Sequence, residues 1–558
     1  MLMMNCSVVY PQAENVPVSN PIYLFMKRME LEGVLPEYPD GILPLSRREI
    51  SEYLAGINER KDQLSDVERR LLEEYNVEFH YDISGFISGM NLPRDTSDHP
   101  VGPMPRRIQT RPQSYLYHYG DTNVSLFIEG LFTLDARGSV HRGADRRYVG
   151  FLQFGGRIRG SIGRGLGYYL QGTNAQFWGD RVILQQDKLL GQSFELNDVG
   201  VRNFDFVEGY VRYDAGIVSI QVGRERLLWG NGYGDKLILS DNPRVFDFIR
   251  LDAHYKTIKY TFLHAWLLGG KSNLLFTLSS DTLSTFTEPV VADKYFAGHR
   301  LEVTIPSYLT VGFQEVVIYS NRAPDLAYLN PVTLIESAQR SREERDNVLW
   351  AFDVQTHFLT NIELQGTVLF DDINFTRWGT NDIQNKYAFQ LGTMVVGPGI
   401  LRNTSMAVEY TRIEPYTFSH ARSRNDNYGS SGRILGHRLG PNADSWFVRL
   451  DHIFSHKVRS TISYEVGRRG DNVYDSSGAL IINSGGDFLQ PHRPGDPAEK
   501  RFLAGDVVYI HNMELFITYE IVNEVFFDIR YNSQKCVRPM SNESWSTRSY
   551  GAAIRVVF

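Results

Sequence analysis

The sequence predicts an all-β transmembrane barrel of antiparallel strands, preceded by a small α-helical segment. Three observations support this: aromatic residues and glycine are abundant, hydrophobic residues recur at every second position beyond about residue 79, and the last alternating segment ends on an aromatic residue. The 558 residues include 31 Tyr, 32 Phe and 48 Gly, residue types that favour pleated strands and tight turns.

Charge and hydropathy narrow the function classes. A formal net charge of -7 and a pI of about 6.1 provide no basic field of the kind that attracts nucleic acid, so neither DNA nor RNA is expected as a partner. Mean hydropathy is -0.29, and no run approaches the roughly 20 apolar residues of a membrane-spanning helix. Barrel strands alternate lipid-facing with lumen-facing residues, so a transmembrane barrel has the same mildly polar average. With only Cys6 and Cys536, disulfides cannot form a framework.

The residues before the barrel are expected to form two parts. Residues 1–13 have an apolar core without a basic start, and we interpret them as the remnant of a signal peptide; an ordinary disordered terminus is the alternative. Residues 14–78 are predicted to form a helical periplasmic segment. Asn20 and Pro21 begin its first helix and Gly33 ends it, and two capping boxes, SRRE (46–49) and SDVE (65–68), begin two more helices.

Residues 79–558 are predicted to form the outer-membrane barrel. Roughly 20 alternating segments of about 8 to 11 residues occur, the length of a tilted strand that crosses a bilayer. Soluble β-sandwiches also alternate, so the pattern alone favours a membrane barrel only weakly. One of the clearest segments places Leu515, Ile517, Tyr519 and Ile521 on one face, opposite Glu514, Thr518 and Glu520.

Three further features favour the membrane barrel. Short turns such as residues 214–216 alternate with long polar loops such as 413–444 and 468–511, so we expect residues 20–78 to be periplasmic and both long loops extracellular. The last strand ends on Phe558, which resembles the end signal of bacterial outer-membrane proteins. Aromatic residues lie at or near many strand ends, as in interfacial girdles: Phe358, Phe370, Trp446, Phe454, Tyr531 and Tyr550. Each unpaired backbone group in lipid costs several kcal/mol, so the sheet must close.

The densest polar run, residues 299–372, is expected to line the lumen. Charged side chains on the inner face of a wide barrel normally pair with one another and with water, so a structural network is the favoured interpretation, and a polar conduit or binding wall is the alternative. The members of this predicted lumen network are Arg300, Glu302, Glu315, Arg322, Asp346, Asn347 and Asp353.

A second run, residues 222–252, has the composition of a sugar site. A sugar needs an aromatic plane against its C–H face and amides, carboxylates or arginine for its hydroxyl groups. Aromatic, glycine-rich loops also occur without any ligand, so a plain loop is the alternative. The candidate carbohydrate-binding residues are Trp229, Asn231, Tyr233, Asp235, Asn242 and Arg244, with Tyr328 and Asn330 from the neighbouring polar run.

The sequence contains no recognisable catalytic constellation. The motifs G-x-S-x-G and H-E-x-x-H and a P-loop are absent, and the 14 histidines are scattered singly. Asp371 and Asp372 are neighbours on one predicted strand, so their side chains point to opposite faces and cannot form an acid–base pair. We therefore expect no enzyme activity, no cofactor and no metal site.

Several segments, taken in their order and spacing, resemble the Wzi family of capsule assembly proteins. They are PLSRREI (44–50), WGNGYGDKLILSDNPRVF (229–246), HRLE (299–302), YLNP (328–331), the pair Asp346 and Asn347, and DDI (371–373). The resemblance implies a barrel of about 18 strands, closed on the periplasmic side by the N-terminal helices. It also implies an outer-membrane lectin that holds capsular polysaccharide on the cell surface.

The resemblance and the strand pattern together define the expected partners. These are capsular polysaccharide or another exopolysaccharide, outer-membrane lipid and lipopolysaccharide, and the barrel assembly machinery. A substrate-selective porin for small polar solutes is the alternative function, because a charged lumen is also suited to transport. An outer-membrane hydrolase would need a nucleophile and a base at one rim, and the sequence nominates no such pair.

Overall fold

A computed structural model describes residues 13–84, 115–121, 123–141, 146–163, 165–277, 285–342, 345–398, 401–420 and 424–558, with the backbone alone for residues 271–290. Residues 1–12, which make up most of the predicted signal-peptide remnant, lie outside the described residues. The predicted barrel segment from residue 79 onward begins with a short helix, and its first strand is described from Tyr117.

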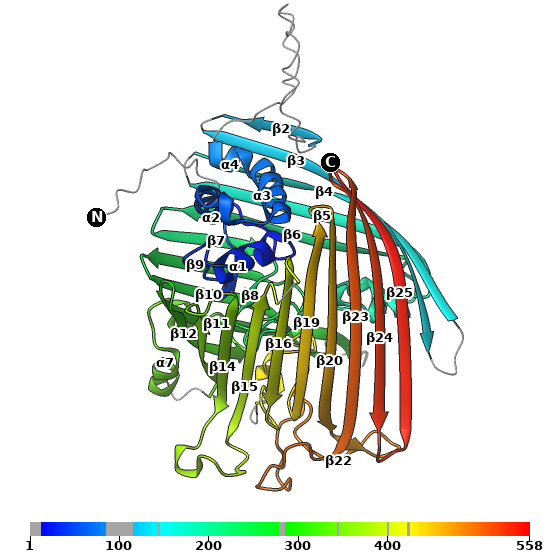
Figure 1. The fold of residues 1–558 in the computed structure, drawn as a ribbon. Coiled ribbons are helices and arrows are strands. Elements are labelled where there is room, and N and C mark those ends of the chain that lie inside the picture. The colour runs from blue at the N-terminus through cyan, green and yellow to red at the C-terminus, as the bar shows by residue number, and fades with distance from the viewer. Residues whose placement is uncertain are drawn as a thin grey trace, which may run out of the picture.

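A closed barrel of 18 antiparallel strands confirms the predicted fold class. Each barrel strand pairs with the next along the chain, and β25 closes the ring on β3 (Figure 1). The short strand β2 (Tyr117–Gly120) extends the sheet along the remaining part of β3. The barrel strands are β3 (Val124–His141), β4 (Arg146–Ile162), β5 (Leu166–Gly179), β6 (Asn203–Asp214), β7 (Val218–Arg224), β9 (Asp247–Tyr255), β10 (Ile258–Thr277), β11 (Thr285–Ile305), β12 (Leu309–Ser320), β13 (Asn347–Thr356), β14 (Ile362–Asp372), β15 (Lys386–Val396), β16 (Thr404–Ile413), β19 (Ala443–Ser455), β20 (Val458–Asp471), β23 (Asp506–Val522), β24 (Val525–Arg538) and β25 (Glu543–Val557).

The remaining elements lie in the connections between barrel strands or before the barrel. The short strands are β1 (Ile42–Leu43), β8 (Leu228–Trp229), β17 (Gly429–Ser430), β18 (Arg433–Ile434), β21 (Val473–Tyr474) and β22 (Leu480–Ile482). The helical turns are η1 (Lys61–Gln63), α5 (Val182–Gln185), η2 (Leu190–Gln192), η3 (Glu195–Asn197), α6 (Leu326–Leu329), α7 (Ile335–Ser341), η4 (Phe375–Arg377) and η5 (Arg424–Asp426).

The outer surface of the barrel is apolar because alternate residues of each strand point outward. On β7 the exposed outward residues are Val218, Ile220 and Val222. Trp446 and Tyr550 are also exposed, as expected for the aromatic girdles predicted from the sequence. The barrel therefore has the surface of an outer-membrane-type β-barrel, apolar in its band and aromatic at its edges.

Four N-terminal helices close the end of the barrel where the strands are joined by short turns (Figure 1). Asn20 accepts a hydrogen bond from the first amide of α1 at 2.9 Å, and Gly33 follows the helix at φ +77°. Both predicted capping boxes form, at Ser46 and at Ser65. Among the described residues, none of the helices has the length and apolarity needed to span a membrane. The helices are α1 (Ile22–Leu31), α2 (Arg47–Glu59), α3 (Asp66–Glu78) and α4 (His80–Ser84).

Segments from both ends of the barrel meet in the lumen. The chain between α1 and α2 enters from the helical end, and its strand β1 pairs with β8, which belongs to the connection between β7 and β9. Around this pairing lies a hydrophobic core made of inward-facing residues of β9–β16, residues of the connection between β7 and β9, and residues of the connection between β16 and β19. We call it the lumen core. Trp229 lies in this core and is 1% exposed. Part of the lumen is therefore filled by protein.

A buried lysine ties the helices to the barrel wall. Lys27 Nζ lies 2.9 Å from Glu30 Oε2, 2.6 Å from Glu363 Oε2 on β14 and 3.3 Å from Asp40 Oδ2. Burial alone would lower the pKa of Lys27, but the three carboxylates outweigh burial and raise this pKa well above its usual range. The ammonium group is therefore charged, and it neutralises carboxylates from both the helical segment and the wall.

We predict that Lys27→Ala destabilises the protein by about 3–5 kcal/mol, because it leaves buried carboxylates without their cation. The measurement is urea unfolding of the refolded barrel, together with protease digestion of the N-terminal helices. Lys61→Ala is the matched control, since Lys61 is exposed in η1. Equal unfolding curves for the two variants would contradict a role for Lys27 as the anchor.

A second prediction concerns Trp229 as a core residue. Trp229→Ala should lower the free energy of unfolding by about 3–5 kcal/mol, because it leaves a cavity in the lumen core. Trp446→Ala, at an exposed outward position, should cost much less. A stability loss no larger for Trp229→Ala than for Trp446→Ala would show that the core tolerates the cavity.

Candidate functional site

The aromatic residues predicted to stack on a sugar are buried inside the barrel, Trp229 in the lumen core and Tyr233 in a separate apolar cluster with Leu31 and Met394. Trp229 packs edge-to-face against Phe296 at 6.0 Å between ring centroids. Tyr233 is also buried, and its hydroxyl donates to Glu363 Oε1 at 2.7 Å. The expectation that these two rings form an exposed sugar platform was wrong, because the segment carrying them folds into the barrel and not outward from its rim.

Four of the residues predicted for the lumen network, Arg300, Glu302, Asp353 and Asn347, lie on the inner wall. Arg300 lies 2.8 Å from Glu302 and 2.5 Å from Asp353 on the inner wall, with all three side chains buried. Asn231, a predicted sugar ligand, donates its amide to Asp353 Oδ1 at 3.2 Å. Asn347 also faces inward and donates to the Asp426 carbonyl at 2.9 Å. We call residues 225–246, between β7 and β9, the lumen segment; Asn231 fixes this segment to the wall, and Asn347 does the same for the connection between β16 and β19.

The other predicted network residues lie on the outer side of the wall. Helices α6 and α7, between β12 and β13, pack against outward residues of β11 and β12 (Figure 1). Glu315 points outward and accepts the first two amides of α7 at 2.9 and 2.8 Å. Asp346 pairs with Arg322 at 2.6 Å and accepts the Tyr328 hydroxyl at 2.7 Å. Their assignment to the lumen was wrong, because sequence alternation does not say that a helical pair covers this face. Asn330, in the same connection, is exposed.

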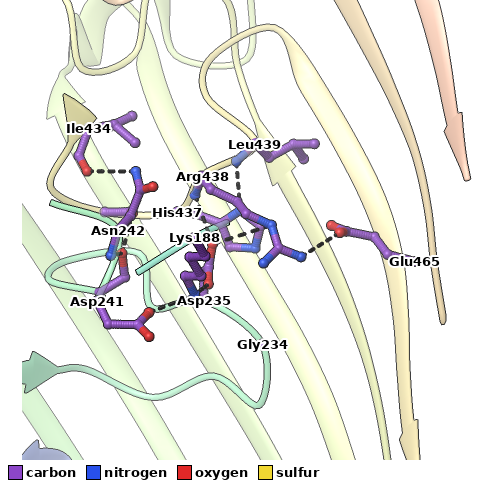
Figure 2. Close-up of polar contacts among 12 residues, drawn as sticks. Lys188, Gly234, Asp235, Asp241, Asn242, Ile434, His437, Arg438, Leu439 and Glu465 are labelled. Carbon is purple, nitrogen blue, oxygen red and sulfur yellow. Dashed lines mark hydrogen bonds and ion pairs between the residues drawn. The ribbon is translucent and has the colours of Figure 1, made fainter. Parts of the chain in front are cut away.

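A cluster of charged residues surrounds Asp235, in the middle of the lumen segment (Figure 2). Lys188 Nζ lies 2.8 Å from Asp235 and 2.6 Å from Asp241. Arg438 donates its backbone amide to Asp235 at 3.1 Å, and its guanidinium lies 2.8 Å from Glu465 of β20. The side chains of Lys188 and Arg438 are 33% and 35% exposed, so water reaches this cluster.

Electrostatics fix the charge state of this cluster. Burial alone would raise the pKa of the Asp235 carboxyl, but the positive charges of Arg438 and Lys188 outweigh it and hold that pKa well below its usual range. Burial is the largest influence on His437 and lowers its pKa. At neutral pH the cluster therefore presents an ionised carboxylate and two cations beside a neutral imidazole, a set of donors and acceptors suited to hydroxyl groups.

β23 adds an aromatic ring to the polar inner wall. Phe516 is 41% exposed although its neighbours on the same face are polar. It pairs with Arg530 of β24, whose guanidinium lies 6.0 Å from the ring centroid. A ring that faces water in a polar lumen offers the apolar surface that the buried Trp229 does not provide.

Glu514 connects this ring to the charged cluster. It lies two residues before Phe516, is exposed, and accepts the side-chain amide of Asn512 at 3.0 Å. Asn512 pairs in register with Glu465, the partner of Arg438. We call the set of residues Lys188, Asp235, Asp241, Arg438, Glu465, Glu514 and Phe516 the lumen site.

The sequence predicted only one member of the lumen site, Asp235. Of the other predicted sugar ligands, Asn242 is partly exposed beside it and donates to the Ile434 carbonyl at 2.9 Å, and Arg244 lies over the Phe194 ring at 4.2 Å. Phe516 carried a usable signal, because it interrupts the polar face that Glu514 and Thr518 define. Lys188 and Arg438 lie in loops without a pattern that would have identified them.

One other group of ligand-type side chains is found among the described residues. Glu30, His357 and Glu363 bring their side-chain nitrogen and oxygen atoms within 4.8 Å of one another. Lys27 Nζ already contacts both carboxylates at this place. A protein ammonium therefore supplies the positive charge that a metal ion would bring.

Comparisons with known proteins agree with this architecture. The family described as capsule assembly protein Wzi matches residues 118–488. No curated protein matches the sequence. A solved structure of Escherichia coli Wzi, described as a carbohydrate-binding β-barrel and an outer-membrane protein involved in group 1 capsule assembly, is 12% identical with a TM-score of 0.58. The match covers 98% of this chain and 99% of that chain, so the two share a fold over nearly their whole length.

Two solved structures of Pseudomonas aeruginosa proteins are more distant. OccK5 (OpdH) is 10% identical with a TM-score of 0.41, over 77% of this chain and 98% of that chain. OprD is 9% identical with a TM-score of 0.40, over 78% of this chain and 95% of that chain. The family match covers most of the described barrel, including the lumen segment and β20. The chain therefore belongs to the Wzi family of capsule assembly proteins.

Proposed function

We propose that this protein is a lectin-like outer-membrane protein that binds capsular or other surface polysaccharide at the lumen site and attaches it to the cell surface. The observation that carries this proposal is the water-exposed ring of Phe516, on the same strand face as Asn512, which pairs in register with Glu465 of the charged cluster around Asp235. Its family membership and the carbohydrate binding described for Escherichia coli Wzi support the same function.

The lumen site has the chemistry that a sugar chain needs. Phe516 offers an apolar face for the C–H groups of a sugar ring, and the carboxylates and cations around it bind hydroxyl or carboxylate groups. Each contact is weak, but a repeating polymer presents many copies of the same unit, so a high effective concentration holds the chain. Asp235, Asn242 and Arg244 are the sequence-predicted ligands that stay in this proposal.

The proposed role is binding and not catalysis. The barrel assembly machinery is its proposed partner during insertion, because the barrel closes by the pairing of β25 with β3 and has an apolar outer face. Outer-membrane lipid and lipopolysaccharide are its proposed surroundings, because the outward faces of the strands are apolar.

A porin is the alternative that a charged lumen suggests. The N-terminal helices and the lumen core occupy much of the passage, which favours retention of a polymer over passage of a solute. Conductance in planar bilayers separates the two functions: a lectin barrel should be nearly silent, and regular opening steps would support the porin.

The proposed orientation places the long connections of the barrel outside the cell and the N-terminal helices in the periplasm. We predict that a cysteine introduced at Ser477, in the long connection between β20 and β23, reacts with a membrane-impermeant maleimide on intact cells. A cysteine at Glu73 of α3 should react only after the outer membrane is opened. Both side chains are exposed, so a difference in labelling between the two cysteines would report the side of the membrane and not burial. The reverse labelling pattern would invert the proposed orientation.

The functional prediction is that cells lacking the protein still export polysaccharide but release it into the medium. Phe516→Ala with Glu514→Gln should reproduce this release, because loss of a stacking ring removes on the order of 1–3 kcal/mol of apolar contact, up to about a hundredfold in affinity. The measurement is the ratio of cell-bound to free polysaccharide at equal barrel abundance.

The matched control is Tyr519→Ala. Tyr519 lies on the same strand and is 42% exposed, but it faces outward, so this variant should retain polysaccharide. Unchanged retention in the deletion strain would contradict the lectin function itself. Release of polysaccharide by the deletion strain but not by the double variant would show that the polysaccharide binds at a site other than Phe516.

A further inference from the structure

The outer wall carries a basic groove at the long-loop end of β24 and β25. The groove has a volume of about 480 Å³ and is lined by Val140, Ser533, Lys535, Ser544, Trp545, Ser546 and Arg548. Lys535 and Arg548 are both exposed, and Ser546 and Ser533, their respective partners in the strand register, add two hydroxyl groups. The groove therefore combines positive charge with neutral hydrogen-bond donors.

The strand register fixes the height of this groove on the barrel. Tyr531 of β24 pairs with Tyr550 of β25. The next pair of outward-facing residues along these two strands is Ser533 with Arg548. The Tyr550 ring covers Gly138 of β3, which in turn pairs with Tyr148 of β4. Three tyrosines thus form a girdle at the edge of the apolar surface, and the basic groove lies about 7 Å further along the strands. In a bilayer this level is that of the lipid headgroups.

A third cation extends the same row. Arg548 pairs with Val140 of β3, which pairs with Arg146 of β4. Arg146 and Arg548 are thus two strands apart, about 10 Å, and Lys535 is the diagonal neighbour of Arg548. All three side chains are exposed. This spacing suits a ligand that carries more than one anionic group.

These cations differ from the other arginines at this end of the barrel. Arg468 lies 2.5 Å from Asp444, and Arg538 lies 2.7 Å from both Asp471 and Asp506. Among the described residues, by contrast, no carboxylate forms an ion pair with Lys535, Arg548 or Arg146. A row of exposed, uncompensated cations beside a girdle attracts an anion, and arginine and lysine are the residues that bind phosphate oxygens.

We propose that this groove binds the phosphate groups of a glycolipid in the outer leaflet. The acyl chains of that lipid would lie against the apolar wall below the tyrosine girdle, and its phosphates would contact Arg548, Lys535 and Arg146. The long-loop end must face outward for this, so the inference uses the orientation proposed above but not the polysaccharide function. The consequence is a barrel fixed in depth by its lipid while the lumen site binds polymer.

The test is binding of diphosphorylated lipid A to the purified full chain in detergent, measured by native mass spectrometry. The variant is Arg146→Gln with Lys535→Gln and Arg548→Gln, and we expect binding at least tenfold weaker than for the wild type. The matched control is Lys256→Gln with Arg402→Gln and Lys457→Gln, which removes the same charge from the short-turn end. Heat-modifiable migration on gels checks that each barrel is folded, and Arg548→Gln alone serves as the milder variant.

Four outcomes decide the proposal. Weaker binding of diphosphorylated lipid A by the groove variant, but not by the control variant, supports the proposal. Weaker binding of singly phosphorylated than of diphosphorylated lipid A by the wild type also supports it. Equal lipid binding by the groove variant and the control would overturn it. Competition by inorganic phosphate at the same concentration as lipid A would overturn the lipid assignment, because it would assign the site to a free anion.

Discussion

The hydrogen-bond requirement of the backbone in lipid determines the rest of this structure. A strand with an unpaired edge in the hydrocarbon would lose several kcal/mol for each exposed amide or carbonyl, so the sheet has to close. The pairing of β25 with β3 removes the last two edges. Because these two strands are near opposite ends of the barrel sequence, closure makes the whole chain from β3 to Val557 one cooperative unit.

Closure at this size creates a second requirement, because inward side chains alone do not fill so wide a lumen. The protein fills it with its own chain, from the helical end through β1 and from the other end through β8. Inward charges of the wall then find partners on the inserted segments, as Glu363 does with Lys27 and Asp353 with Asn231. The polar inner face that makes a barrel possible in lipid also provides the attachment points for its plug.

Period-two alternation and capping chemistry are local properties, so the sequence predicted the barrel, its helical opening and both capping boxes. The path of a connection is not local. Residues 225–246 have the composition of an exposed loop, and glycine with aromatic residues is equally suited to a segment inserted in a lumen, so the burial of Trp229 and Tyr233 was not predictable from them. Likewise, alternation placed Glu315 on a face of its strand but could not say that α7 covers that face.

The two halves of the lumen differ, and this difference explains where the site lies. On the side of β9–β16 many inward residues join the lumen core, and inward charges such as Arg300 and Glu363 are buried in ion pairs. On the side of β20, β23 and β24 most inward residues are polar, and Glu514 and Phe516 among them are exposed. The filled half holds the lumen segment rigidly, so Asp235 is presented at a fixed distance from Glu465 and Glu514. A binding surface that needs preorganised polar groups and an accessible ring is therefore expected at the boundary between the two halves, where Arg438 bridges Asp235 and Glu465.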